Sequence, residues 1–93
     1  MKLDEHCAAS LRLFGDEYHE VHVWLDEFFP TMGAHHRRKR HHLAGIEIVR
    51  QKWGDKAAEV ARQHIVDDLR LEGWTEKDGL PRDEDHYTRM GLF

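Results

Sequence analysis

"GDKAAEVARQHIVDDLRLEG", residues 54 to 73, is the stretch that decides the fold. Asp55 at its start and Gly73 at its end predict a helix that runs to about Leu71. One face of this helix, at spacings of three and four, carries Ala57, Val60 or Ala61, His64, Asp68 and Leu71. An otherwise apolar face therefore includes a histidine and an aspartate four positions apart.

Three more main helices are expected before it, over residues 4–14, 16–29 and 34–53, from apolar periodicity and from stops at Gly15, Pro30 and Gly54. Asp16 is the expected N-cap of the second. The expected apolar face of the first helix is Leu3, Cys7, Leu11 and Phe14, and that of the second is Val21, Leu25 and Phe28. The third helix carries an apolar stripe of Ile46, Val49 and Trp53, which extends back through His42.

These segments predict an all-α fold, a compact bundle of four main helices in a single domain over residues 1–93. The core is expected over about residues 3–72. Residues 73–93 form a C-terminal extension in which Pro81 and the acidic residues 83–85 favour a short added helix. Trp74, Tyr87 and Phe93 indicate that this extension docks on the body of the protein.

Composition bounds the class of protein. The 93 residues are 40% hydrophobic and 34% charged, as in a globular domain. No apolar run approaches the roughly 18 residues of a membrane span, so no membrane association is expected. Cys7 is the sole cysteine, so no internal disulfide can form, and a cytoplasmic location is the prediction.

Histidine and aspartate recur at helical spacing on the faces expected to pack together. His22 precedes Asp26 by four residues, as His64 precedes Asp68, and such a pair can bind one cation or orient an imidazole. His42 lies on the expected apolar stripe of the third helix. His6 joins as a further candidate because the first helix must pack on the others. The predicted metal ligands are His6, His22, Asp26, His42, His64 and Asp68.

Two interpretations of this set stay open, a metal or catalytic site and a structural network of buried polar groups. For the first, imidazole with carboxylate favours a divalent transition metal such as zinc, iron, manganese or nickel. His64 and Asp68 are the predicted catalytic residues, with metal-assisted hydrolysis of a phosphoester as the best reaction class. Cys7 is expected in the core.

The charge is unevenly distributed along the chain. Residues 35–56 carry a net charge of +5, between flanks of -5 and -4. Within "HHRRKRHH", residues 35–42, the candidates for contact with a phosphorylated small molecule or a nucleic acid are Arg37, Arg38 and Arg40. The alternative is a solvated basic face whose charge is neutralised by acidic residues such as Asp26, Glu27 or those of the tail.

The competing function is a non-enzymatic interaction module. Its basic segment would bind nucleic acid or an acidic partner, and its histidines and aspartates would be structural. A third hypothesis is a pH-responsive assembly protein, because nine histidines titrate near pH 6.5. A homodimer is also expected of a small helical domain that completes its core by association.

A longer pattern combines these motifs: His6-x3-Ser10-x4-Gly15, His22-x3-Asp26, Arg40-His41-His42-x2-Gly45-Ile46 and Gln63-His64-x3-Asp68. It resembles a family of small, uncharacterised bacterial and phage proteins of unknown function. The resemblance covers residues 6 to 69 and implies no activity, but it selects the same polar residues. A weaker similarity, in chemistry alone, is to HD-type phosphohydrolases, whose adjacent His-Asp pair is absent.

Overall fold

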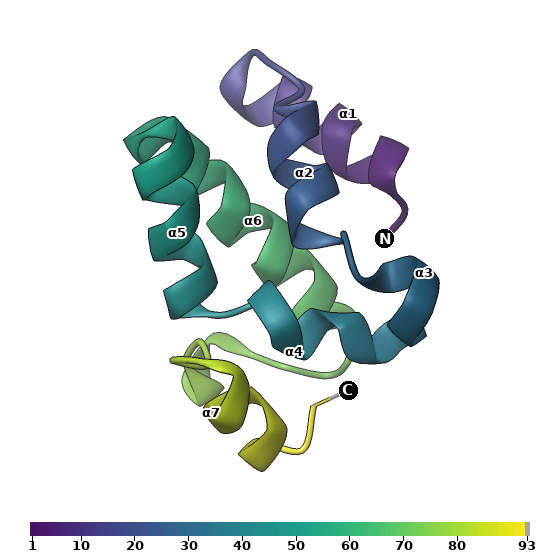
Figure 1. Ribbon diagram of the computed structural model, residues 1–93. Coiled ribbons are helices and arrows are strands. Elements are labelled where there is room, and N and C mark those ends of the chain that lie inside the picture. Colours follow the sequence, from purple (N-terminus) through teal and green to yellow (C-terminus); the bar gives the residue numbers. More distant parts are fainter. Residues whose placement is uncertain (93) are drawn as a thin grey trace.

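The structure is a computed structural model, and it describes residues 1–92; Phe93, expected to dock with the tail, lies outside the described residues. The predicted all-α class is confirmed: the described residues form helices, turns and loops, without strands (Figure 1). The elements are α1 (Leu3–Phe14), α2 (His19–Leu25), α3 (Phe29–Met32), η1 (Gly33–His36), α4 (Arg37–Arg40), α5 (Leu43–Trp53), α6 (Asp55–Leu71), η2 (Glu76–Asp78) and α7 (Glu84–Arg89).

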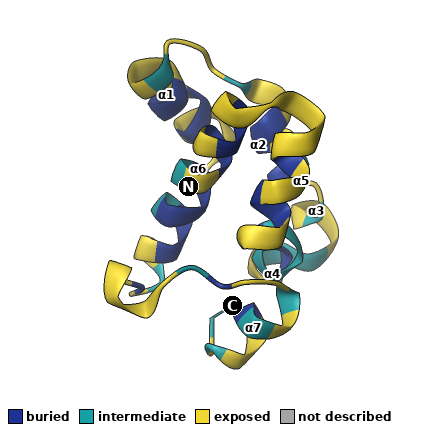
Figure 2. Ribbon diagram, turned by 90° about the vertical axis from the view of Figure 1, so that its left-hand side faces the viewer, coloured by how far each residue is buried: buried dark blue, intermediate teal, exposed yellow. Residues whose placement is uncertain are grey.

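Helix α6 is the element on which the other long helices pack. It contacts α1, α2 and α5, and its buried residues form the centre of the core (Figure 2). The predicted inward face of α6 is confirmed at His64 and Asp68, which are both about 1% exposed. The expectation for Leu71 was wrong, since it is 66% exposed. The chain turns back at Gly73, and Leu69 and Trp74 are buried there instead, joined by a backbone hydrogen bond of 3.1 Å.

Helix α1 turns a polar side toward the protein interior. Leu3 and Leu11 of its predicted apolar face are 38% and 51% exposed, whereas His6 and Ser10 are buried beside Cys7. The reason is that His6 and Ser10 have hydrogen-bonding partners on α6 and α2, described below, which compensate for their burial. The prediction for this face is therefore confirmed at Cys7 and Phe14 and wrong at Leu3 and Leu11.

The predicted second helix is shorter than expected. It begins after Tyr18, because the Asp16 carboxylate accepts the Tyr18 N–H in a tight turn instead of capping the helix directly. It ends at Leu25, and Asp26 leaves helical geometry with its side chain directed at the site. Pro30 lies in the first turn of α3, where its missing N–H breaks no helical hydrogen bond.

The predicted third helix, 34–53, was wrong as a single element. It is broken into η1, α4 and α5, with His41 and the extended His42 between the last two. His42 caps α5, because its Nδ1 accepts the Gly45 N–H at 3.0 Å. The N–H groups of Leu43 and Ala44 donate to Pro81 and Arg82 carbonyls of the tail. The cap on α5 and the hydrogen bonds to the tail thus stabilise the break between α4 and α5. This break directs His41 into the interior.

The C-terminal extension contributes to the core, which continues past residue 72. Trp74 and Tyr87 are 5% and 0% exposed and belong to the main hydrophobic cluster. The Trp74 indole donates to the Gly79 carbonyl at 2.7 Å. The predicted short helix is present as α7, and Asp83 caps it by accepting the His86 N–H.

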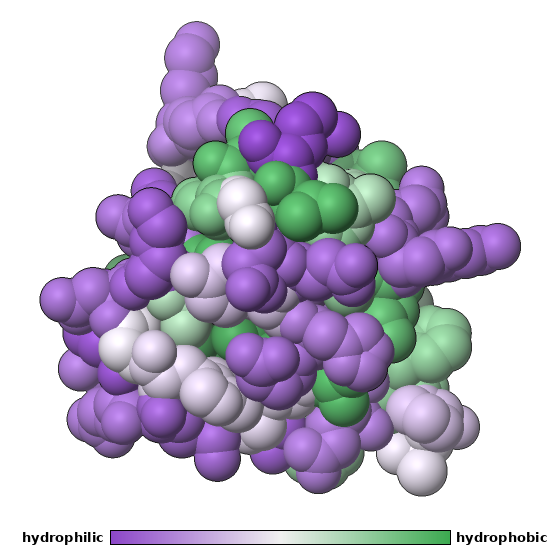
Figure 3. Space-filling model, turned by 90° about the horizontal axis from the view of Figure 1, so that it is seen from above, coloured by the Kyte–Doolittle hydropathy of each residue, from purple (hydrophilic) through white to green (hydrophobic). Residues whose placement is uncertain are grey.

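The surface seen from above is mainly hydrophilic, with a small group of hydrophobic side chains near its middle (Figure 3). No helix among residues 1–92 is both long and apolar enough to cross a membrane.

We expect Gly45→Ala to destabilise the fold by about 1–3 kcal/mol, the usual cost of overpacking. A Cβ atom at Gly45 would overlap the backbone carbonyl of Arg40, so α4 and α5 would have to separate at the break. Urea denaturation measures the free energy of unfolding. Gln51→Ala, an exposed change in the same helix, is the control and should stay within about 0.5 kcal/mol of the parent. Equal stabilities for the two variants would contradict this close approach.

Candidate metal centre

The Asp68 carboxylate is the hub of a buried polar cluster. Its Oδ2 lies 3.0 Å from His41 Nε2 and 3.3 Å from His64 Nε2. Its Oδ1 lies 3.2 Å from His6 Nε2 and 3.1 Å from the amino group of Met1. Three histidines from α1, α6 and the α4–α5 break therefore converge on one side chain that is 2% exposed.

Asp26 brings a second carboxylate to the same two imidazoles. Its Oδ1 lies 3.2 Å from His64 Nε2 and 3.5 Å from His41 Nε2. Asp26, His41, His64 and Asp68, here named the quartet, each offer one ligand atom, and these atoms lie within 4.8 Å of one another. The quartet can hold a metal ion.

His36 extends the cluster in an unusual way. Its Nδ1 lies 2.6 Å from the Gly33 carbonyl, to which it donates. In a neutral imidazole the other nitrogen, Nε2, then carries a lone pair. That nitrogen lies 3.0 Å from Asp26 Oδ1, so a lone pair faces a carboxylate unless a cation or a proton lies between them.

A chain of three side chains leads from the quartet to α1. The Nδ1 atoms of His64 and His22 lie 2.7 Å apart, so one nitrogen donates and the other accepts. His22 Nε2 lies 2.7 Å from the Ser10 hydroxyl. His6 stacks on His64 with ring centroids 3.5 Å apart, and His6, His22 and His64 form a second group whose ligand atoms are within 4.8 Å. His64 belongs to both groups.

Two cluster nitrogens lack hydrogen-bonding partners. Nδ1 of His6 and Nδ1 of His41 are buried and make no hydrogen bond within the described part of the chain. Each ring is therefore fixed through Nε2 alone.

The structure brings together five of the six residues predicted as ligands: His6, His22, Asp26, His64 and Asp68. His42 lies elsewhere, because it caps α5 and its Nε2 donates to the Lys39 carbonyl at 3.0 Å. The adjacent His41 takes its expected place, and His36 was also missed. The prediction selected His42 because an uninterrupted helix over 34–53 would place it on the apolar stripe. The sequence signal that could have located the break is the run of four like charges before His41.

The basic segment is largely paired with acidic side chains. Arg37 donates to Glu72 at 2.7 Å and lies 3.6 Å from Asp68. Lys39 pairs with Glu84 at 3.2 Å. Arg40 pairs with Glu27 at 2.8 Å, donates to the Trp24 carbonyl and stacks on the Trp24 and Phe28 rings. Arg38, the third predicted contact, is half-buried, and its Nε has no hydrogen-bonding partner within residues 1–92.

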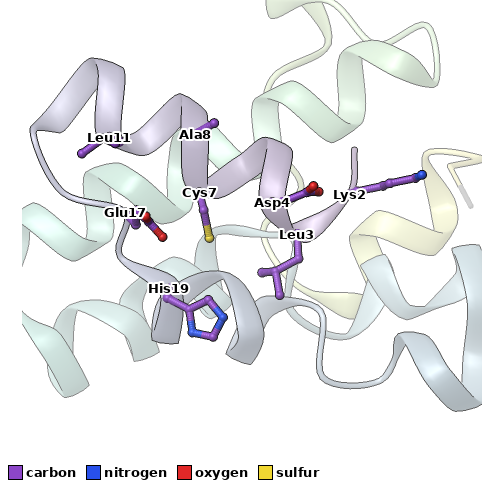
Figure 4. Close-up of a pocket in the computed structure, with 8 residues that line it drawn as sticks. All are labelled: Lys2, Leu3, Asp4, Cys7, Ala8, Leu11, Glu17 and His19. Carbon is purple, nitrogen blue, oxygen red and sulfur yellow. The ribbon is translucent and has the colours of Figure 1, made fainter.

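A pocket of about 650 Å³ opens beside the quartet. Asp26, His36 and Asp68 line its polar part, next to Arg37. A separate hollow of about 590 Å³ lies where α1 meets the start of α2, and there Cys7 points from α1 toward α2, which carries His19 (Figure 4). Burial raises the pKa of the Cys7 thiol, and nearby carboxylates raise it further, so the thiol stays protonated.

Burial sets the protonation of the cluster. Burial and, after it, the neighbouring histidines bring the pKa of His22 to about 3, and burial brings that of His41 to about 4 although its hydrogen bond with Asp68 opposes the effect. Burial alone would raise the pKa of Asp68, but hydrogen bonds with His41, His6 and His64 outweigh it and hold that pKa far below its usual value. Hydrogen bonds with His36 and His64 lower the pKa of Asp26 in the same way, against the effect of burial. His22 and His41 are thus neutral, and Asp26 and Asp68 are ionised, which are the forms that bind metals.

We expect the metal-free protein to lose stability as the pH falls from 7.5 to 5. His22 and His41 take up protons near pH 6.5 when unfolded but only at about pH 3 and 4 when folded. The unfolded state therefore binds more protons in this window, and acid favours it. His64, whose pKa hydrogen bonds to Asp26 and Asp68 raise against the effect of burial, opposes the trend in part.

Urea denaturation in the presence of a chelator measures this dependence. A loss of at least about 1 kcal/mol is expected, since one pKa unit corresponds to about 1.4 kcal/mol. The control is His19→Gln, which alters an exposed histidine and should keep the same pH dependence. A free energy of unfolding that is flat from pH 7.5 to 5 would rule out neutral buried histidines.

Comparison with known proteins gives a family without an assigned activity. No curated protein and no solved structure matches this chain. A family model, described as a domain of unknown function (DUF6915), matches residues 1–77, which include every residue of the cluster described above. The chain belongs to this family, DUF6915.

Proposed function

We propose that this protein binds a divalent transition metal through Asp26, His41, His64 and Asp68. The observation that carries the proposal is the convergence of two carboxylates and two imidazoles, three of them almost fully buried, on one small volume. Zinc, iron, manganese and nickel are the candidate ions, since this mixed nitrogen and oxygen ligation suits them.

The spacing of the four ligand atoms supports a metal. The four distances between the two Nε2 atoms and the two carboxylate oxygens are 3.0, 3.2, 3.3 and 3.5 Å. Bonds of about 2.0–2.1 Å to zinc at tetrahedral angles place neighbouring ligands about 3.3 Å apart. The four nitrogen–oxygen distances of the quartet are therefore compatible with an ion at its centre.

The lone pair of His36 is a second argument for a cation. Its Nε2 faces Asp26 Oδ1 at 3.0 Å while its Nδ1 is committed to Gly33. A metal bound at Asp26 removes this repulsion, and His36 Nε2 is then available as a fifth ligand. A metal-free network explains the contacts of His41 and His64 equally well, through donated N–H groups, but it satisfies the contact between His36 and Asp26 only if both nitrogens of His36 carry a proton.

We expect His41→Asn to lose metal binding and His42→Asn to keep it. The two histidines are adjacent, but only His41 reaches the carboxylates, whereas asparagine at position 42 still caps α5. Isothermal titration of metal-free protein with zinc, manganese, iron(II) and nickel should show one tight site for at least one of them.

Asp26→Asn is the second variant, because Asp26 is 20% exposed and its loss disturbs the interior less than the loss of His41. It should weaken metal affinity by at least tenfold. Circular dichroism confirms that each variant is folded. If the parent protein binds none of the four metals, or if His42→Asn abolishes binding as His41→Asn does, the proposed site is wrong.

We further propose that the bound metal supports hydrolysis of a phosphoester. A bound zinc ion lowers the pKa of water to about 7 and so supplies hydroxide near neutral pH. The attack of that hydroxide forms a bond to phosphorus, the bond from phosphorus to the leaving oxygen breaks, and that oxygen takes up a proton.

The hydrolysis proposal predicts metal-dependent turnover of 4-nitrophenyl phosphate or bis(4-nitrophenyl) phosphate. Asp26→Asn should reduce kcat/KM by at least about tenfold, since loss of even a group that only supports a metal ligand costs about 10–100-fold. His42→Asn should retain the activity. Metal binding without turnover of either ester would remove the hydrolase proposal and leave the metal site intact.

Nucleic-acid binding by Arg37, Arg38 and Arg40, dimerisation and a cytoplasmic location stay predictions. Arg37 pairs with Glu72 and Arg40 pairs with Glu27, and these ion pairs favour the alternative in which acidic neighbours neutralise the basic segment.

A further inference from the structure

The pocket beside the quartet has the size of a small-molecule site. Its volume of about 650 Å³ lies within the range of about 300–1,000 Å³ that is typical of ligand pockets. Asp26 and Asp68, two members of the quartet, line it directly. A ligand in this pocket therefore meets whatever ion the quartet binds.

The pocket has an apolar wall as well as a polar one. Leu3, Phe29 and Pro30 line it together with Asp26 and Asp68. Phe29 is 57% exposed and Leu3 is 38% exposed, so both present apolar surface to a ligand. A flat apolar group placed against Phe29 would remove that surface from water and contact the ring favourably.

The charges that line the pocket make anion binding depend on a metal. Lys2, Arg37 and the amino group of Met1 contribute three positive charges, and Glu5, Asp26 and Asp68 contribute three negative ones. Arg37 is held in place by its ion pair with Glu72 at 2.7 Å, and its side chain remains 15% exposed. Without a metal these charges cancel and do not attract an anion, whereas a divalent cation at the quartet gives the lining a net positive charge.

We infer that this pocket binds a small organic phosphate that carries a flat apolar group. The phosphate contacts the quartet metal and Arg37, and the apolar group lies against Phe29. This inference rests on the proposed metal site and adds the class of ligand. The pocket has the volume of a small-molecule site, and the basic segment is paired with acidic side chains, so a small molecule fits these observations better than a nucleic acid does.

Phenylphosphonate, which phosphoester hydrolysis cannot cleave, is the probe, compared with inorganic phosphate by isothermal titration. Zinc-loaded protein should bind phenylphosphonate about tenfold more tightly than phosphate, as expected for partial burial of one aromatic ring. Metal-free protein should bind both at least tenfold more weakly. Benzoate is a third ligand, and equal affinity for benzoate and phenylphosphonate would overturn the preference for a phosphoryl group.

Phe29→Ala should remove the advantage of phenylphosphonate over phosphate while it leaves zinc affinity and phosphate affinity unchanged. The matched control is Leu71→Ala, which shortens another exposed apolar side chain, one outside this pocket, and should change none of these affinities. An unchanged advantage in Phe29→Ala would overturn the inference. Zinc uptake without phenylphosphonate binding would overturn it and spare the metal site, whereas the absence of zinc uptake would overturn both.

Discussion

The buried charge of Asp68 is the interaction on which the rest of the structure depends. An ionised carboxylate that is 2% exposed is strongly unfavourable unless several donors or a cation compensate it. Asp68 obtains this compensation from His6 on α1, His41 at the α4–α5 break and its neighbour His64 on α6. Segments that are distant in sequence are therefore joined at one side chain, and loss of that side chain's partners would leave a charge uncompensated in the core.

This constraint explains why the fold is irregular around a regular centre. Helix α6 is a 17-residue helix with a well-packed apolar face. The segment 26–42, in contrast, consists of short helical pieces and turns. Each interruption aims a polar group inward: Asp26 where α2 ends, His36 at the end of η1, and His41 where α4 ends. A continuous helix could not direct these three side chains to one point.

Much of this architecture is predictable from the sequence. The extents of α1 and α6, the short helix α7 and the inward direction of His64 and Asp68 follow from spacing and from helix stops. The choice between His41 and His42 does not follow, because it depends on contacts with Pro81 and Arg82 about forty residues away. The exposure of Leu3 and Leu11 does not follow for a related reason: the side of α1 that carries Ser10 is buried because Ser10 has its partner, His22, on another helix.

The chain from Ser10 through His22 to His64 links the direction of hydrogen bonds to the state of the quartet. With Nε2 of His64 bound to a metal, a neutral His64 ring carries its proton on Nδ1 and donates it to His22, which in turn donates from Nε2 to Ser10. With Nε2 protonated and bonded to the carboxylates, the polarity of the chain is reversed, and the Ser10 hydroxyl becomes the donor. The tautomers of His22 and His64 and the direction of the Ser10 hydroxyl on α1 therefore depend on whether a metal or a proton lies at the carboxylates of the quartet. This dependence requires no shift of the backbone.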